Sequence, residues 1–145
     1  MAEWSNALVS KTSISERVSK VRILPPPPNM KITKKLFVTT RPRWRKWLQT
    51  NYDKQTEIWL VRYKKTTGKP SVSYQDSVDE ALCFGWIDNA EKGIDQERFA
   101  TRFTPRKKVS SWSEGNVQRY RMLVRQGVMS EAGSAAFRNR KKPRN

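Results

Sequence analysis

Four consecutive prolines, Pro25 to Pro28, divide this 145-residue chain into two unequal parts. Proline lacks a backbone N–H and has a fixed φ, so the run fits neither a helix nor the interior of a sheet and favours a short polyproline spacer. Residues 1–29 are rich in serine and show no sustained periodicity, which predicts a disordered leader. Regular patterns begin at Met30, so we expect one domain over 30–136 and a basic tail over 137–145.

The leader has a second interpretation. The segments EWSNAL (3–8) and VRILPPPP (21–28) resemble a tRNA gene translated in one frame. Under that interpretation residues 1–29 come from a mis-assigned start, and Met30 is the natural first residue. N-terminal sequencing of the endogenous protein distinguishes the two interpretations.

Composition excludes several function classes. The formal net charge is +17, histidine is absent, and Cys83 is the single cysteine. These counts exclude an internal disulfide, Cys/His zinc sites, and nucleophiles activated by histidine. No stretch approaches the roughly 18 apolar residues of a membrane span. We therefore expect a cytoplasmic protein without metal or cofactor, and the charge favours an anionic partner.

The patterns after Met30 predict helices alternating with strands. Runs rich in β-branched and aromatic residues predict strands at KLFVTT (35–40), EIWLVRYKK (57–65), GWIDN (85–89) and ERFATRFTPRK (97–107). We expect the last two to be antiparallel and joined by the polar stretch AEKGIDQ (90–96).

Capping residues and apolar spacing predict four helices. The predicted N-caps are Thr40, Ser73, Ser113 and Ser130, and the predicted ends are Asn51, Gly85 and Gly127. Together the elements predict an α+β fold, with a small antiparallel sheet of three to four strands and helices on one face and at the C-terminal end. We expect the sheet face that carries Trp59 or Ile87 to pack on Leu82, Leu123 and Val124.

One cluster of residues is a candidate site. The hairpin and the helix after it bring together the candidate ligand-binding residues Trp86, Asp88, Arg102, Arg106, Ser111, Trp112, Ser113 and Asn116. A helix N-terminus attracts anions, and guanidinium and hydroxyl groups donate hydrogen bonds to phosphate or carboxylate. The sequence therefore predicts one positively charged pocket, flanked by Lys107 and Lys108, where tryptophan stacks on a base or walls off the site.

Each of these residues also has a structural interpretation. Asp88 is suited to an ion pair or a turn cap, and Ser113 to an N-cap. The two tryptophans are suited to packing, and the run RKK (106–108) to a solvated strip. Cys83 fits a small buried apolar residue better than a reactive thiol.

Three functions remain open at this stage. The first is a non-enzymatic protein that binds an anionic small molecule or an acidic partner near Arg106 and Ser113. The second is a nucleic-acid-binding protein, because aromatic and basic residues are interleaved. The third is a small enzyme with Asp88 as general base and Arg106 stabilising an anion. No catalytic set is recognisable, so a non-enzymatic protein is favoured.

The chain also resembles a known family, the YdeI/OmpD-associated or bacteriocin-protection proteins. The resemblance runs from about Phe37 to about Ala136. It rests on RPRWRKWL (41–48), EIWLVRYKKTTGK (57–69), SYQDSVDEALCFGWIDN (73–89), RFTPRKKVSSWSEGN (102–116) and LVRQGVMSEAG (123–133). The pieces ALCFGWID, FTPRK and SxWSxxN, in this order and spacing, are specific.

The resemblance implies a small α+β bacterial protein of the cytoplasm, with a role in tolerance of bacteriocins. No biochemical activity is established for the family, so the resemblance assigns no catalytic residue, and the motif positions carry over only with unknown role. Relatives continue beyond Ala136 through a further helical stretch, and the leader is foreign to them. Ligand identity and oligomeric state are not specified by the sequence.

Overall fold

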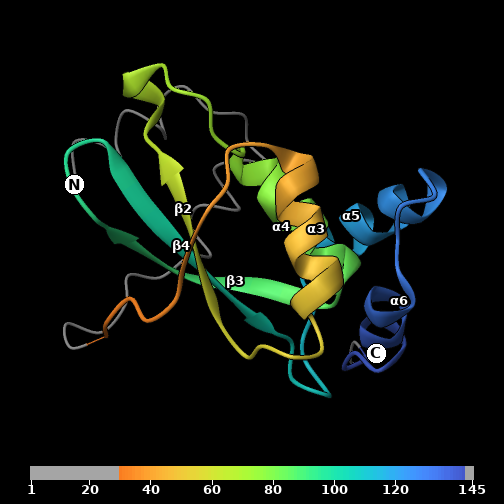
Figure 1. Ribbon diagram of the computed structural model, residues 1–145. Helices are drawn as coiled ribbons and strands as arrows, with labels where there is room; N and C mark the ends of the chain where they lie inside the picture. Colours follow the sequence, from red (N-terminus) through yellow and green to blue (C-terminus); the bar gives the residue numbers. More distant parts are fainter. Residues whose placement is uncertain (1–29, 143–145) are drawn as a thin grey trace.

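Apolar residues that alternate along two long strands build the centre of a four-stranded sheet (Figure 1). The computed structural model describes residues 30–142. The expected leader over 1–29 and the last three residues of the expected tail lie outside the described residues. The predicted α+β fold class is confirmed, because helices pack on one face of this sheet and at its C-terminal end.

The sheet is mixed, in the order β1-β2-β4-β3. β2 (Ile58–Tyr63) and β4 (Arg98–Pro105) are antiparallel, and β3 (Trp86–Gly93) pairs antiparallel with β4. β1 (Lys35–Phe37) runs parallel to β2, because helix α3 (Arg41–Asn51) crosses over between them. The expectation of an antiparallel sheet therefore holds for three strands and is corrected at the β1 edge.

The β3–β4 hairpin is longer than predicted. Residues 90–93, expected within a polar connection, continue β3, and Gly93 pairs with Phe99. A register shift between Asp88 and Ala90 marks a bulge. The expected loop was wrong because Ala90 is buried and Glu91 is half-buried on alternate faces, as strand residues are.

Three serines begin helices as predicted. The side chains of Ser73, Ser113 and Ser130 each accept a hydrogen bond from the backbone N–H three residues later. Their helices are α4 (Tyr74–Cys83), α5 (Glu114–Arg125) and α6 (Glu131–Arg138). Thr40 occupies the N-cap position of α3, although its side chain makes no capping hydrogen bond.

Glycines end two of these helices. Gly85 follows α4 with φ +76° and Gly127 follows α5 with φ +74°, a left-handed conformation that glycine adopts without steric cost. The turn after β2 holds the short 3-10 helix η1 (Lys65–Thr67), closed by Gly68 at φ +69°. Both predicted helix ends are confirmed.

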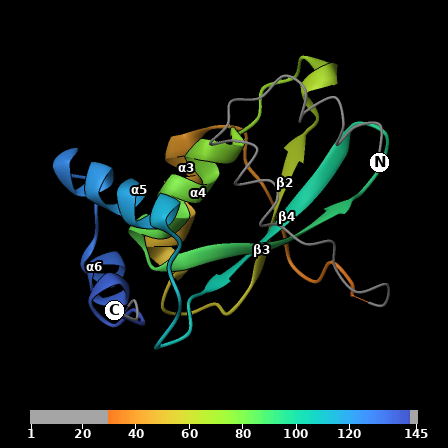
Figure 2. The same ribbon diagram turned by 180° about the vertical axis from the view of Figure 1, so that it is seen from behind.

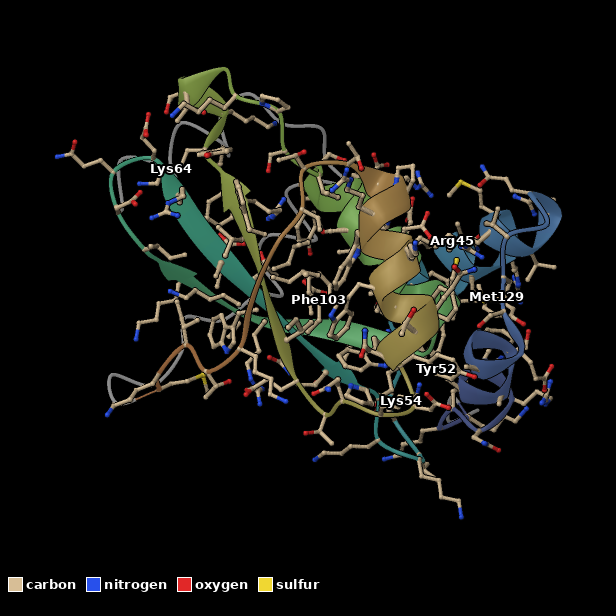
Figure 3. The ribbon with its side chains drawn as sticks, viewed as in Figure 1. Arg45, Tyr52, Lys54, Lys64, Phe103 and Met129 are labelled. Atoms are coloured by element: carbon tan, nitrogen blue, oxygen red, sulfur yellow. The ribbon has the colours of Figure 1, made fainter. Side chains whose placement is uncertain are left out.

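The main core lies between the sheet and α3 and α4 (Figures 1 and 2). Phe103 points from the middle of β4 toward α3, and its ring lies 5.1 Å from that of Trp44 (Figure 3). The other buried members include Leu48, Ile58, Leu60, Leu82, Trp86 and Leu123. Fully burying one such side chain contributes roughly 1.5–3 kcal/mol, so this face supplies most of the fold's stability.

The expectation that the sheet face carrying Trp59 packs against the helices was wrong. Trp59 lies on the face opposite α3 and α4, in a second cluster with Ala90 and Ala100. Strand alternation explains the difference, because Ile58 and Leu60 occupy the helix-facing positions on either side of Trp59. Val124, expected in the core, is 46% exposed.

Helix α6 packs closely against the end of α4. The backbone N–H and the hydroxyl of Ser130 both donate hydrogen bonds to the Cys83 carbonyl oxygen. A Cβ placed on Gly133 would lie 2.5 Å from that oxygen and 2.8 Å from the Leu82 carbonyl oxygen. Only glycine allows this approach, so the position of α6 depends on Gly133.

Candidate functional site

Two cationic segments, far apart in sequence, lie side by side. The backbone N–H of Lys141 donates to the carbonyl oxygen of Ser110, at 2.8 Å. Figures 1 and 2 both show the loop between β4 and α5 beside the C-terminal end of α6. We call this the basic–aromatic surface; it comprises Arg106, Lys107, Lys108, Trp112, Tyr120, Phe137, Arg138, Arg140, Lys141 and Lys142.

Aromatic rings hold two of its guanidinium groups. The guanidinium carbon of Arg106 lies 4.1 Å from the ring centre of Trp112, and that of Arg140 lies 3.7 Å from Phe137. Phe137 also stacks on Tyr120, with centres 3.9 Å apart and planes at 4°. Trp112 meets both of these rings edge-on. These contacts fix the planes of the two arginines.

The surface is strongly positive. Residues 104–112 and 132–142 contain no Asp or Glu, while they supply seven Lys and Arg residues. Lys107, Lys108, Lys141 and Lys142 are exposed, and Arg106 and Arg140 are half-buried. Glu131, at the start of α6, pairs with Arg138 at 2.6 Å in a largely exposed contact. Positive charge concentrated in this way attracts anions.

Ser113 and Asn116 border this surface with structural contacts. Ser113 accepts the backbone N–H of Asn116 at 3.1 Å and thereby caps α5. Asn116 is buried, whereas Ser111 is exposed. Of the eight candidate residues, Arg106, Ser111, Trp112, Ser113 and Asn116 thus lie along the β4–α5 connection and the start of α5.

Asp88 faces a different set of residues. The Tyr74 hydroxyl donates to Asp88 Oδ2 at 2.9 Å. On the same sheet face, the buried guanidinium of Arg62 bonds Thr101 Oγ1 at 3.2 Å and lies 3.9 Å from Glu91. These five residues form what we call the Arg62 cluster.

The Arg62 cluster is enclosed by aromatic rings. Arg62 is 5% exposed, and its guanidinium carbon lies 4.6 Å from the Phe99 ring centre and 5.6 Å from that of Tyr74. Burial lowers the pKa of Arg62, and the charges of Glu91 and Asp88 act in the opposite direction. The cluster is an internal charge-compensated network, and this arrangement suits structure better than catalysis.

Two further predicted residues lie apart from Arg106. Trp86 is 1% exposed in the main core, and its Nε1 donates to the Tyr52 carbonyl oxygen at 3.2 Å. Arg102 pairs with Glu57 and donates to Asn89 Oδ1 at 3.1 Å. Arg102 points away from Asp88, because it alternates with Phe103 along β4.

An arginine–carboxylate network joins α3 to α4, and sequence analysis missed it. Arg41 and Arg45 both pair with Glu80, and Arg41 also pairs with Asp76. The signal was present, because each pair of like charges is spaced i, i+4 and so lies on one helix face. Figure 3 shows Arg45 pointing toward the α5–α6 connection near Met129, where it donates to the Val128 carbonyl oxygen at 2.8 Å.

Cys83 lies beside this network. The thiol is buried, and burial together with the charge of Glu80 raises the pKa of Cys83 to about 11. A thiol with this pKa is a poor nucleophile at neutral pH. The interpretation of Cys83 as a small buried apolar residue is confirmed.

Among residues 30–142, no group of three or more His, Cys, Asp and Glu side chains is arranged to hold a metal ion. No helix in this part of the chain is both long and apolar enough to cross a membrane.

Comparison with known proteins gives one match. Residues 36–136 match the family model described as Domain of unknown function (DUF8412). Neither the curated proteins nor the solved structures contain a match. The matched range includes both the Arg62 cluster and the loop that carries Arg106, but it ends just before Phe137.

Proposed function

We propose that this chain, which belongs to the DUF8412 family, binds an anionic partner through the basic–aromatic surface and is not an enzyme. The observation that carries the proposal is the hydrogen bond from Lys141 N–H to Ser110 O. It holds two cationic segments together that would otherwise repel each other. Bringing like charges together costs free energy, and a bound anion offsets that cost.

The two stacked arginines support the same proposal. A guanidinium group bonds phosphate or carboxylate in a bidentate manner, and its plane must be correctly oriented to do so. Trp112 and Phe137 fix the planes of Arg106 and Arg140, so less side-chain entropy is lost when an anion binds. Four exposed lysines around them strengthen the attraction.

A cellular role follows from the family resemblance described above. On that basis the protein acts in the bacterial cytoplasm, and anion binding contributes to tolerance of bacteriocins or of other stress. Deleting the gene and exposing the cells to bacteriocins tests this extension. Unchanged survival would remove the tolerance role and leave the binding proposal in place.

The enzyme hypothesis receives no comparable support. It requires Asp88 as a general base close to Arg106, but the contacts of Asp88 are with Tyr74 and, electrostatically, with Arg62. A base must lie within hydrogen-bond reach of the proton that it takes. The contacts of Asp88 therefore favour a structural role.

Binding of inorganic polyphosphate to the full chain tests the proposal. We expect the double variant Lys107→Gln/Lys108→Gln to bind several-fold more weakly than the parent, because each lysine neutralises one phosphate. Lys31→Gln/Lys35→Gln is the matched control, since both lysines are exposed and lie outside the surface. Equal losses in the two variants would show that net charge, and not this surface, governs binding.

Arg106 provides a second test. Arg106→Lys keeps the charge but loses the planar stacking on Trp112, and Arg106→Gln loses both. We expect polyphosphate to raise the melting temperature most for the parent, less for Arg106→Lys and least for Arg106→Gln. If all three proteins respond alike, Arg106 does not contact the anion and the proposed location is wrong.

A further inference from the structure

We infer that the anion bound by the basic–aromatic surface is the phosphate backbone of a double-helical nucleic acid, an inference that rests on the proposed function. Three properties of the surface carry it: the number of its cations, the occupied faces of its rings, and its assembly from two segments of the chain.

The number of cations favours a polymer. A single carboxylate accepts about four hydrogen bonds, whereas this surface presents six Lys and Arg residues besides Arg138, which pairs with Glu131. Double-stranded DNA carries one negative charge per roughly 1.7 Å of its axis, a density that engages many cations at once. The surface therefore matches a phosphate polymer better than a small anion.

The occupied rings argue against single strands. Proteins that bind single-stranded nucleic acid stack its bases on exposed aromatic faces. Here Tyr120 stacks on Phe137 at 3.9 Å and Arg140 lies over Phe137 at 3.7 Å. Tyr120 and Arg140 are each so close to the Phe137 ring that they cannot share one of its faces. They therefore cover its two opposite faces, and neither face of Phe137 is left for a base to stack on. Arg106 likewise covers a face of Trp112.

The same occupation argues against an acidic protein as the partner. Protein interfaces gain most of their affinity from aromatic anchors that are buried when the partner binds. In this surface the rings pack on one another and on arginines of the same chain. The groups that the surface offers outward are guanidinium and ammonium groups rather than aromatic anchors.

The two segments approach from different parts of the fold. One precedes α5 and the other follows α6, and the Lys141–Ser110 hydrogen bond sets them alongside each other. A duplex presents the phosphates of two backbones, so both segments have phosphates to contact. Phosphate contacts carry no sequence information, so binding is independent of base sequence.

Fluorescence anisotropy on the full chain provides the test. The probes are a labelled DNA duplex of mixed sequence, an RNA duplex, a DNA single strand of the same length, and heparin as competitor. We expect either duplex to bind more tightly than the single strand, with affinity that falls steeply as salt rises. Lys107→Gln/Lys108→Gln should reduce the slope of log K against log salt by about 2, close to one per lysine. Lys31→Gln/Lys35→Gln should leave that slope unchanged.

Phe137→Leu separates backbone binding from base stacking without changing charge. If the ring only holds Arg140, the variant weakens duplex and single strand by the same factor. If bases stack on the ring, the single strand alone loses affinity, and the inference is overturned. The melting temperature of the variant confirms that it is folded.

The remaining outcomes separate the inference from the proposed function. Tighter binding of the single strand than of the duplex overturns the inference. The inference is also overturned if polyphosphate binds and the duplex does not, or if heparin displaces the duplex at equal charge concentration. Either result leaves the proposed function intact. If neither polyphosphate nor duplex binds at low salt, the proposed function fails as well.

Discussion

Arg62 and Arg106 both lie against aromatic rings, but the groups that surround their positive charges differ. Arg62 is buried beneath α4, where Glu91, Asp88 and Thr101 of the same chain face its guanidinium. Arg106 lies at a half-exposed position in a segment without carboxylates. An arginine whose counter-charge is built into the fold contributes to structure. An arginine held against a ring among other cations adds to the positive charge of its surface.

The largest expected effect is on the free energy of unfolding when the buried Arg62 is replaced. Removing one member of a buried charge network leaves the others uncompensated and costs about 3–5 kcal/mol. We therefore expect Arg62→Met to lower the free energy of unfolding by about that amount, measured by urea denaturation. Arg106→Met should cost only about 1 kcal/mol, the range of an exposed cation–π contact. Equal costs for the two variants would remove the distinction between the clusters.

The second prediction concerns the helix that supports only the basic–aromatic surface. Gly133→Ala forces a Cβ against the Cys83 and Leu82 carbonyl oxygens, and overpacking of this kind costs about 1–3 kcal/mol. Gly115→Ala in α5 is the control, because its Cβ would approach only Ser113 Oγ at 3.9 Å. That control should be neutral or stabilising by up to about 1 kcal/mol, as alanine favours helix. A stabilised Gly133→Ala variant would show that the close approach is not required.

The third prediction concerns the link between Tyr74 and Asp88. Tyr74→Phe removes the donor to Asp88 Oδ2 and should cost about 0.5–1.5 kcal/mol of unfolding free energy, the net value of one hydrogen bond. Polyphosphate affinity should not change, because the Arg62 cluster is separate from the basic–aromatic surface. Lost affinity in a stably folded Tyr74→Phe protein would show that the two regions are coupled.

The smallest expected effect concerns the ion pair between Arg102 and Glu57, which lies near the surface. Burial works against ionisation of Glu57, but hydrogen bonds from Thr33 and Arg102 hold the pKa of Glu57 below its ordinary value. A carboxylate with a lowered pKa stabilises the fold above its unfolded pKa of about 4.3 and loses that contribution as pH falls through the folded pKa.

Glu57→Gln should therefore destabilise the protein by no more than about 1 kcal/mol at neutral pH. The difference from the parent should shrink as pH falls below about 4, because the parent is then protonated as well. Thermal melts at a series of pH values measure this difference. If the difference in stability between Glu57→Gln and the parent grows as pH falls, Glu57 is not the group whose protonation changes the stability.

Sequence patterns predicted local structure well wherever a residue acts on its own neighbours. The three serine caps and the terminating glycines were found because a cap bonds within the same turn of the chain. The strands were found from their β-branched and aromatic residues, although the end of β3 was not. Its last residues are polar, and only their pairing with β4 makes them a strand.

Contacts between distant segments were harder to predict. Asp88 was placed with Arg106, yet strict alternation along β2 puts Arg62 on the same face as Ile58 and Leu60, and hence toward Asp88. That signal was in the sequence and was missed because an arginine in a strand suggests a solvent-facing position. The fit of Gly133 against α4 left no comparable signal, since it depends on how two helices meet in space.

The two hydrogen-bonding roles of Ser130 have a consequence for the order in which the helices form. One hydroxyl both starts α6 and anchors it to the last turn of α4, which lies 47 positions earlier in the chain. An eight-residue helix does not persist alone in water, so α6 forms only on a finished α4. Arg138 at its end and Arg140 just after it acquire fixed positions at that moment and not before. A nascent or unravelled chain thus carries the same charges but not their arrangement.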